Sequence, residues 1–256
     1  MATFIKIVGS LIETLQKILI QGEIDEYEND KQMHCDARLV EMLDRLSKDV
    51  QASVKFSESF LIEKIQFLEE VKGIRLPLFI PHSVFLRLLK KKINSVSEFP
   101  IKFVNNVWGY LETVCAKVLI DQCGNYPKLL PSMKKATEHV MSKMKAKFAE
   151  RVVEMIEMEK ITDYTCDPDF ISSYNKLMNY HAQFLNLLTS YMSNSITVEG
   201  YGSINIRHLS EVPENTRNQA FDLKMMMTTY WKIVLKRMVD FLALQLRFFI
   251  QKVVKK

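Results

Sequence analysis

Apolar residues recur at intervals of three and four along most of the chain, which is the spacing of one face of an α-helix. The N-terminal example runs from Thr3 to Gln21 and stops at Gly22. An acidic stretch with few apolar residues then continues to Asp30, which indicates a solvated break. The pattern therefore predicts a first amphipathic helix that is interrupted over residues 22–35.

The next run predicts one long helix from Asp36, a candidate N-cap, to Val71. Its apolar residues follow a period near 3.5, typical of a helix that packs in a bundle or coiled coil. Gly73 is a candidate terminating residue, and prolines follow it closely. We therefore expect a tip loop at residues 71–81.

A third run extends from His82 to about Cys123 and contains Pro100. Proline removes a helical hydrogen bond and its ring clashes with the preceding turn, so a kink is expected near Phe99.

The remainder of the chain predicts two long helices and a less regular segment between them. Residues 132–164 and 214–256 carry helical stripes. Asp167-Pro168-Asp169 predicts the start of a shorter helix that ends near Met192. Residues 193–213 contain two glycines and alternate rather than repeat helically, so we expect a long surface loop with short extended pieces, cleaved early by a nonspecific protease.

Composition supports a helical fold. The chain has 7 glycines and 7 prolines among 256 residues, roughly 5% against a usual total of about 12%. β-Sandwiches, barrels and βαβ arrays need more turns than this allows. We predict an all-α fold, an elongated antiparallel four-helix bundle with a kinked first helix, a Pro-kinked second helix and one long loop before the last helix.

The charges, the cysteines and the lack of long apolar segments indicate the protein's environment and exclude one class of partner. The formal net charge is +5, from 35 basic and 30 acidic residues that are mixed along the chain, unlike a nucleic-acid-binding protein. Four cysteines without a CxxC pair fit a reducing cytosol. The N-terminus does not resemble a signal peptide, and no apolar window reaches about 18 residues. A cytoplasmic protein without a nucleic-acid partner is expected.

The sequence holds no P-loop, GxGxxG, HExxH or GxSxG motif. None of the histidines has a His or Cys partner four residues away, so no metal or cofactor is predicted; they are His34, His82, His139, His181 and His208. Three carboxylates near one helix end are interpreted as a charged face of the bundle rather than a catalytic pair: Glu154, Glu157 and Glu159.

Arg87, Lys90, Lys91 and Lys92 form a compact basic cluster. One interpretation is a solvated helix face. The other is contact with an anionic surface, either a membrane or a microtubule.

Three segments, in the same order and spacing, resemble the stalk of the dynamin superfamily. They are residues 71–79 with the following Phe85, Lys91-Lys92-Ile93 and Phe99-Pro100; residues 158–165; and residues 230–234 with Asp240. The resemblance is to Mx-like, plant-type dynamin-related proteins and covers nearly the whole chain. It implies a middle region at 1–165, a short helix plus loop at 166–213, and a GTPase effector helix at 214–256, all in one structural domain.

The resemblance also implies which residues take part in assembly. Gly22 matches a glycine at the break of the first stalk helix, and Met158 matches a methionine of the central, symmetric stalk interface. The tip loop used in higher-order contacts corresponds to Val71, Lys72, Gly73 and Ile74. The loop at 193–213 corresponds to the one that relatives use to recognise lipid or antiviral targets.

The family's GTPase head has no counterpart in this chain, and its effector helix usually continues past Lys256, which suggests an excised fragment or a truncated gene product. The resemblance implies a non-enzymatic stalk that self-associates, joins full-length relatives and couples them to a membrane or microtubule. Two alternatives remain: a headless adaptor that regulates full-length relatives by co-assembly, and an enzyme whose active site is hidden in the bundle.

Overall fold

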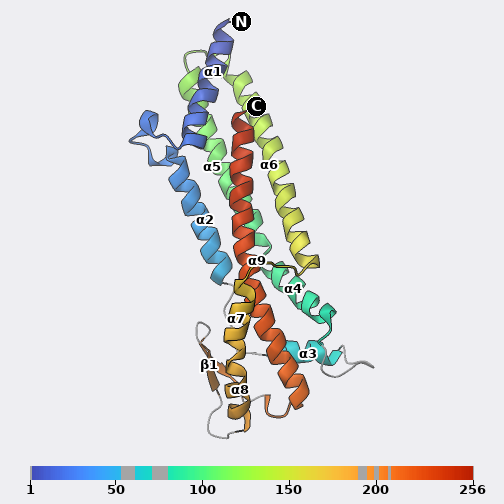
Figure 1. Ribbon diagram of the computed structural model, residues 1–256. Coiled ribbons are helices and arrows are strands. Elements are labelled where there is room, and N and C mark those ends of the chain that lie inside the picture. Colours follow the sequence, from blue (N-terminus) through green and yellow to red (C-terminus); the bar gives the residue numbers. More distant parts are fainter. Residues whose placement is uncertain are drawn as a thin grey trace. The chain divides into compact units, whose positions relative to one another are not determined.

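A computed structural model describes residues 2–52, 61–70, 80–189, 195–198, 202–206 and 209–255 (Figure 1). Most of these residues are helical, which confirms the all-α class. The chain divides into two compact units. The first comprises Met1–Asp49, Val96–Ile156 and Met238–Lys256, and the second comprises Val50–Ser95 and Glu157–Arg237. The four-helix bundle and the single structural domain stay predictions.

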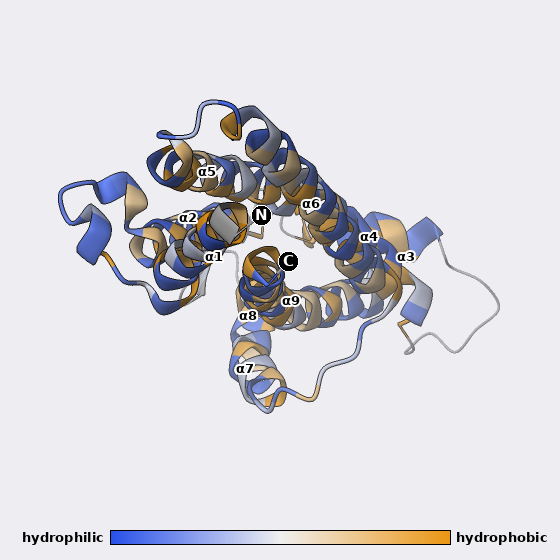
Figure 2. Ribbon diagram, turned by 90° about the horizontal axis from the view of Figure 1, so that it is seen from above, coloured by the Kyte–Doolittle hydropathy of each residue, from blue (hydrophilic) through white to orange (hydrophobic). Residues whose placement is uncertain are grey.

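The first unit is built from helices that carry both hydrophobic and hydrophilic residues (Figure 2). It contains α1 (Ala2–Gln16), a π-helical turn (Lys17–Gln21), two 3-10 turns (Asp25–Tyr27 and Lys31–Met33), most of α2 (Cys35–Ala52), α5 (Glu98–Cys123), most of α6 (Leu130–Ile161) and the end of α9 (Glu214–Val254).

Aromatic rings form the centre of this unit. The ring centroids of Trp108 and Phe148 are 5.6 Å apart, and those of Phe148 and Phe249 are 5.5 Å apart. Such pairs contribute about 0.5–1.5 kcal/mol beyond their buried area. The indole N–H of Trp108 donates to the carbonyl of Met141 at 2.8 Å, so its polar atom is satisfied inside the core.

The second unit contains α3 (Ile62–Glu70), most of α4 (His82–Val96), the end of α6, α7 (Asp169–Met178), α8 (Tyr180–Thr189), a hairpin of β1 (Ser195–Val198) and β2 (Gly202–Asn205), and the beginning of α9. Phe184 of α8 stacks on Phe221 of α9 at 4.7 Å. Tyr230 lies edge-on to Phe85 at 5.8 Å and to Phe170 at 6.3 Å. These contacts tie α4, α7 and α8 to the first part of α9.

The prediction of one helix from Asp36 to Val71 is wrong. Leu61 has φ 67°, a left-handed value that breaks a right-handed helix, and α3 starts after it. Helix α2 starts at Cys35, so Asp36 lies in its first turn rather than at the N-cap. A carboxylate there still interacts favourably with the helix dipole. Most of the predicted tip loop, residues 71–79, lies outside the described residues.

The interruption attributed to Pro100 is present, slightly earlier than expected. Helix α4 ends at Val96 and α5 begins at Glu98, with Ser97 between them. Pro100 has no N–H to donate to the carbonyl of Val96, four residues earlier, which removes the bond that would join the two helices.

The helices at 132–164 and 214–256 are confirmed as α6 and α9. The segment after Asp167 forms two helices, because α7 ends before Asn179 and α8 follows it. The Asp167 carboxylate accepts the N–H of Asp169 at 2.9 Å, but α7 begins at Asp169, so Pro168 rather than Asp167 lies at the N-cap.

The extended pieces predicted within 193–213 pair as an antiparallel hairpin. Ile196 lies opposite Ile204, and Ser195 opposite Asn205. Ile196 and Ile206 are both buried, so this segment contributes apolar side chains to the unit.

Candidate assembly surface

Met158 lies at the exposed end of α6. Its exposed fraction is 52%, and Ile161, one turn later, is 68% exposed. Met155 and Ile156, just before it in the same helix, are buried. Residues three apart share a helix face, so Met158 and Ile161 form a small exposed apolar pair, called here the α6 patch. Both side chains are available to a partner, while a role of Met158 in assembly stays a prediction.

The adjacent face of α6 is held by a buried ion pair. Glu159 is 6% exposed. Its two carboxylate oxygens accept from Arg237 of α9, Oε1 from Nε at 2.6 Å and Oε2 from Nη2 at 2.7 Å. Arg237 also donates to the Tyr164 carbonyl at 3.1 Å and to the Tyr230 hydroxyl at 3.2 Å. The hydrogen bonds with Glu159 raise the pKa of the Arg237 guanidinium above its usual value.

These contacts correct the interpretation of Glu159 as part of a charged outer face, and they support that interpretation for Glu154 and Glu157. Glu159 does not belong to a solvated face, because Arg237 neutralises it inside the unit. Glu154 and Glu157 are exposed and pair with Arg151 and Lys160 on their own helix, each at 2.7 Å. No signal in the sequence distinguishes Glu159, since its partner lies 78 residues away. The bidentate contact fixes the end of α6 that carries the α6 patch.

Gly22 ends the first helical segment with φ 71°. Its N–H donates to the carbonyl of Lys17, and a Cβ atom at this position would overlap the carboxylate of Asp36. The same carboxylate lies 3.5 Å from the guanidinium of Arg247 on α9. Gly22 is therefore required for a close approach of the chain to the start of α2. Its role in assembly stays a prediction.

The acidic break after Gly22 is anchored on α5. Tyr27 donates its hydroxyl to Asp121 at 2.7 Å, and Tyr110 donates to the carbonyl of Gln32 at 2.7 Å. Lys117 pairs with Asp30, and this hydrogen bond lowers the pKa of the Asp30 carboxyl. Side chains from α5 thus hold this segment in place, although its sequence indicates only a solvated break.

The basic cluster is only partly a solvated face. Arg87 pairs with Glu70 at 2.9 Å and lies over the ring of Phe67 at 4.5 Å. Lys91 pairs with Glu63 at 2.8 Å, and the Lys92 ammonium lies 4.6 Å from the centre of the Trp231 ring. Lys90 is exposed. Contact of this cluster with an anionic surface stays a prediction. The remaining predicted assembly residues, Val71, Lys72, Gly73 and Ile74, lie outside the described residues.

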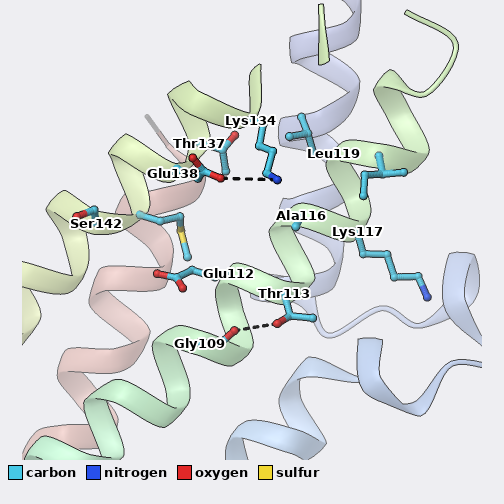
Figure 3. Close-up of a pocket in the computed structure, with 12 residues that line it drawn as sticks. Gly109, Glu112, Thr113, Ala116, Lys117, Leu119, Lys134, Thr137, Glu138 and Ser142 are labelled. Atoms are coloured by element: carbon cyan, nitrogen blue, oxygen red, sulfur yellow. Dashed lines mark hydrogen bonds and ion pairs between the residues drawn. The ribbon is translucent and has the colours of Figure 1, made fainter. Parts of the chain in front are cut away.

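A pocket of about 830 Å³ lies between α5 and α6 in the first unit (Figure 3). Its walls mix small residues such as Gly109 and Ala116 with two basic and two acidic side chains. Lys134 and Glu138 form an ion pair at 4.0 Å, while the Thr113 hydroxyl donates to the carbonyl of Gly109 on its own helix. The balanced charges and the locally satisfied hydroxyl do not resemble a nucleophile beside a base.

Among the residues that the structure describes, no three His, Cys, Asp or Glu side chains gather in a way that would hold a metal ion. None of the helices in this part of the chain combines the length and the apolar character needed to cross a membrane.

Comparison with known proteins connects this geometry to a family. Residues 1–179 match the family model described as the dynamin central region. Over 250 residues, or 97% of the chain, the sequence is 38% identical to Dynamin-related protein 4C from Arabidopsis thaliana. The chain spans 37% of the length of that relative.

Proposed function

Because this chain belongs to the dynamin superfamily, through the family of its central region, we propose that it is a non-enzymatic stalk that assembles with copies of itself and with full-length dynamin-related proteins. In such assemblies it links the polymer to a membrane or a microtubule. A protein that polymerises through a helical surface must expose apolar side chains that its own core does not use.

The observation that carries this proposal is the exposed α6 patch beside a rigid anchor. Met158 and Ile161 face solvent, while Glu159, between them in sequence, is held by Arg237. An apolar pair on a fixed helix end loses little conformational freedom when a partner covers it. In a two-fold interface the same pair acts from both chains, so its contribution is doubled.

The test is the substitution Met158→Asp. It would place two unpaired carboxylates in the interface, each costing several kcal/mol. A micromolar dimer is worth about 8 kcal/mol, so the substitution should dissociate it. Light scattering after size exclusion should show a dimer or larger species for the unsubstituted chain and a monomer for the variant. Because Met158 is half exposed, helicity and melting temperature should change little.

Ile171→Asp is the matched control. Ile171 is 59% exposed on α7 of the same unit, and the resemblance assigns it no contact. Its variant should keep the mass of the unsubstituted chain. A chain that is monomeric at every accessible concentration would disprove self-assembly, and an unchanged mass for Met158→Asp would exclude the α6 patch as the interface.

The non-enzymatic part of the proposal is tested separately, by GTP turnover. We expect no phosphate release above background, since the 256 residues contain no P-loop pattern. Saturable hydrolysis would overturn this part and leave the assembly proposal to the mass measurements.

A further inference from the structure

Four of the nine described residues that line a small cavity in the second unit are lysines. Its volume is about 170 Å³, and residues of α3, α4 and the first part of α9 form its walls. Figure 1 shows α3 beside this part of α9. The charged residues of the lining are Glu63 and Lys64 from α3, Lys91 and Lys92 from α4, and Lys224 from α9. Among the described residues of the lining, positive groups therefore outnumber negative groups by three.

Glu63 cannot balance this charge, because two lysines already share it. Its carboxylate accepts from Lys64 at 2.5 Å and lies 2.8 Å from the ammonium of Lys91. Burial raises the pKa of the Glu63 carboxyl, but the two lysines outweigh burial and hold that pKa at about 2. Glu63 thus stays ionised and fully engaged with Lys64 and Lys91 over the physiological range.

Lys92 and Lys224 are held near other cations. Burial lowers the pKa of the Lys92 ammonium to about 8, and the charge of Lys64 adds to the shift. Burial likewise lowers the pKa of Lys224 to about 7, helped by Lys64 and Lys92. Like charges that converge from three helices repel one another in a partly desolvated space, and a bound anion would remove that repulsion.

Two of these lysine side chains are held inside the unit rather than extended into solvent. The side chain of Lys64 is only 10% exposed. The Lys92 ammonium lies 4.6 Å from the centre of the Trp231 ring, which fixes where its charge sits. Ser95 and Thr228 also line the cavity. The Ser95 hydroxyl donates to the Lys92 carbonyl at 2.6 Å, so the hydroxyl donor that the lining offers to an anion is that of Thr228.

The size of the cavity limits the anion. Sites for drug-sized ligands measure about 300–1,000 Å³, so a nucleotide does not fit inside about 170 Å³. A phosphate monoester is compact, carries nearly two negative charges at neutral pH, and offers three strong acceptor oxygens. Lysine binds phosphate as a point charge and needs no bidentate geometry. We propose that this cavity binds a phosphate monoester group through Lys64, Lys92 and Lys224, either free in solution or on a lipid headgroup.

Calorimetric titration of the 256-residue chain with inorganic phosphate tests the proposal. We expect saturable binding that Lys224→Met and Lys64→Met each weaken by about tenfold or more. Phosphate should also raise the melting temperature of the unsubstituted chain, because a ligand that binds only the folded state stabilises it. The same rise should be absent in Lys224→Met, whose circular dichroism spectrum establishes that it is folded.

Proton uptake gives a second readout, which diffuse surface charge would not produce. A bound anion raises the pKa of Lys92 and Lys224, so binding near pH 8 should take up protons. Titrations in two buffers that differ in ionisation enthalpy measure this uptake. The matched control is Lys236→Met, which removes an exposed lysine from the same part of α9 and should leave binding and uptake unchanged.

Vesicle sedimentation separates the two sources of phosphate. Vesicles of phosphatidylcholine with a minor fraction of phosphatidic acid are compared with phosphatidylcholine alone. Lysine-dependent binding to the phosphatidic acid vesicles would assign the site to a lipid headgroup, and binding of inorganic phosphate alone would assign it to a soluble ligand. Absence of both, or an equal loss of binding in Lys236→Met, would overturn the proposal.

Discussion

Arg237 and Glu159 are joined by two parallel hydrogen bonds of 2.6 Å and 2.7 Å, across 78 residues of sequence. The pair connects the end of α6 to α9 within the second unit. Because the Glu159 side chain is only 8% exposed, its charge needs a partner, and Arg237 supplies one. The same helix end presents Met158 to solvent, so the ion pair positions the proposed assembly surface.

Arg237→Met should therefore destabilise the chain. Loss of one partner of a buried pair costs about 3–5 kcal/mol, and the 39% exposure of the Arg237 side chain should reduce this to about 2 kcal/mol. Urea unfolding followed by circular dichroism measures the change. The combined variant Glu159→Leu with Arg237→Met should recover most of the loss, because no unpaired charge remains.

Arg151→Met is the control for this measurement. Arg151 pairs with Glu154 at the same distance of 2.7 Å, but both side chains are at least half exposed. An exposed pair contributes about 0–1 kcal/mol, so little change is expected. Equal losses in the Arg151 and Arg237 variants would show that burial does not determine the strength of the α6–α9 pair.

Gly22→Ala should cost about 1–2 kcal/mol from its left-handed backbone alone, with a further loss from overlap with Asp36. Gly9→Ala provides the opposite case. Gly9 lies within α1, and a Cβ atom there would meet nothing within 4 Å. The alanine should stabilise the helix by about 0.5–1 kcal/mol. Thermal unfolding of the two variants should shift in opposite directions, and a loss in both would contradict the structure at Gly9.

The four cysteines should differ sharply in reactivity. Cys166 is exposed, while Cys35, Cys115 and Cys123 are buried. Burial raises the pKa of the Cys115 thiol to about 12, so little thiolate forms there near pH 8. Titration with Ellman's reagent should detect one fast thiol in the native chain and four after unfolding. Cys166→Ser should abolish the fast phase; two or more fast thiols would contradict the described burial.

The lysine cavity should make stability depend on pH. The folded pKa of Lys224, about 7, is below its unfolded value of 10.5, so between these values the folded chain holds fewer protons than the unfolded chain. The free energy of unfolding then rises with pH across this window, and the penalty for burying the charge is complete below it. Removing the lysine removes this dependence.

The measurement compares Lys224→Met with the unsubstituted chain at several pH values. The stability of the variant relative to the unsubstituted chain should be greatest near pH 6 and should decline as the pH approaches about 9. Lys236→Met should show a constant difference over the same range. A Lys224→Met difference that does not vary with pH would mean that Lys224 titrates as an ordinary exposed lysine.

Local rules read from the sequence account for many of the element ends. Gly22 stops the first helical segment, the Asp167 carboxylate accepts the N–H of the first residue of α7, and Pro100 separates α4 from α5 because it has no N–H for the carbonyl of Val96. The interruption near Leu61 was not predictable in this way. The apolar period continues through that position, and nothing in a leucine signals a left-handed backbone.

The same distinction between local rules and tertiary contacts applies to the candidate site. The sequence by itself determined the all-helical class and the family resemblance, because the apolar period and the order of short motifs can both be read along the chain. Only the tertiary structure decided that Glu159 meets Arg237 and that lysines from three helices surround Glu63. Those contacts join residues far apart in the chain, and a one-dimensional pattern holds no information about which helix faces meet.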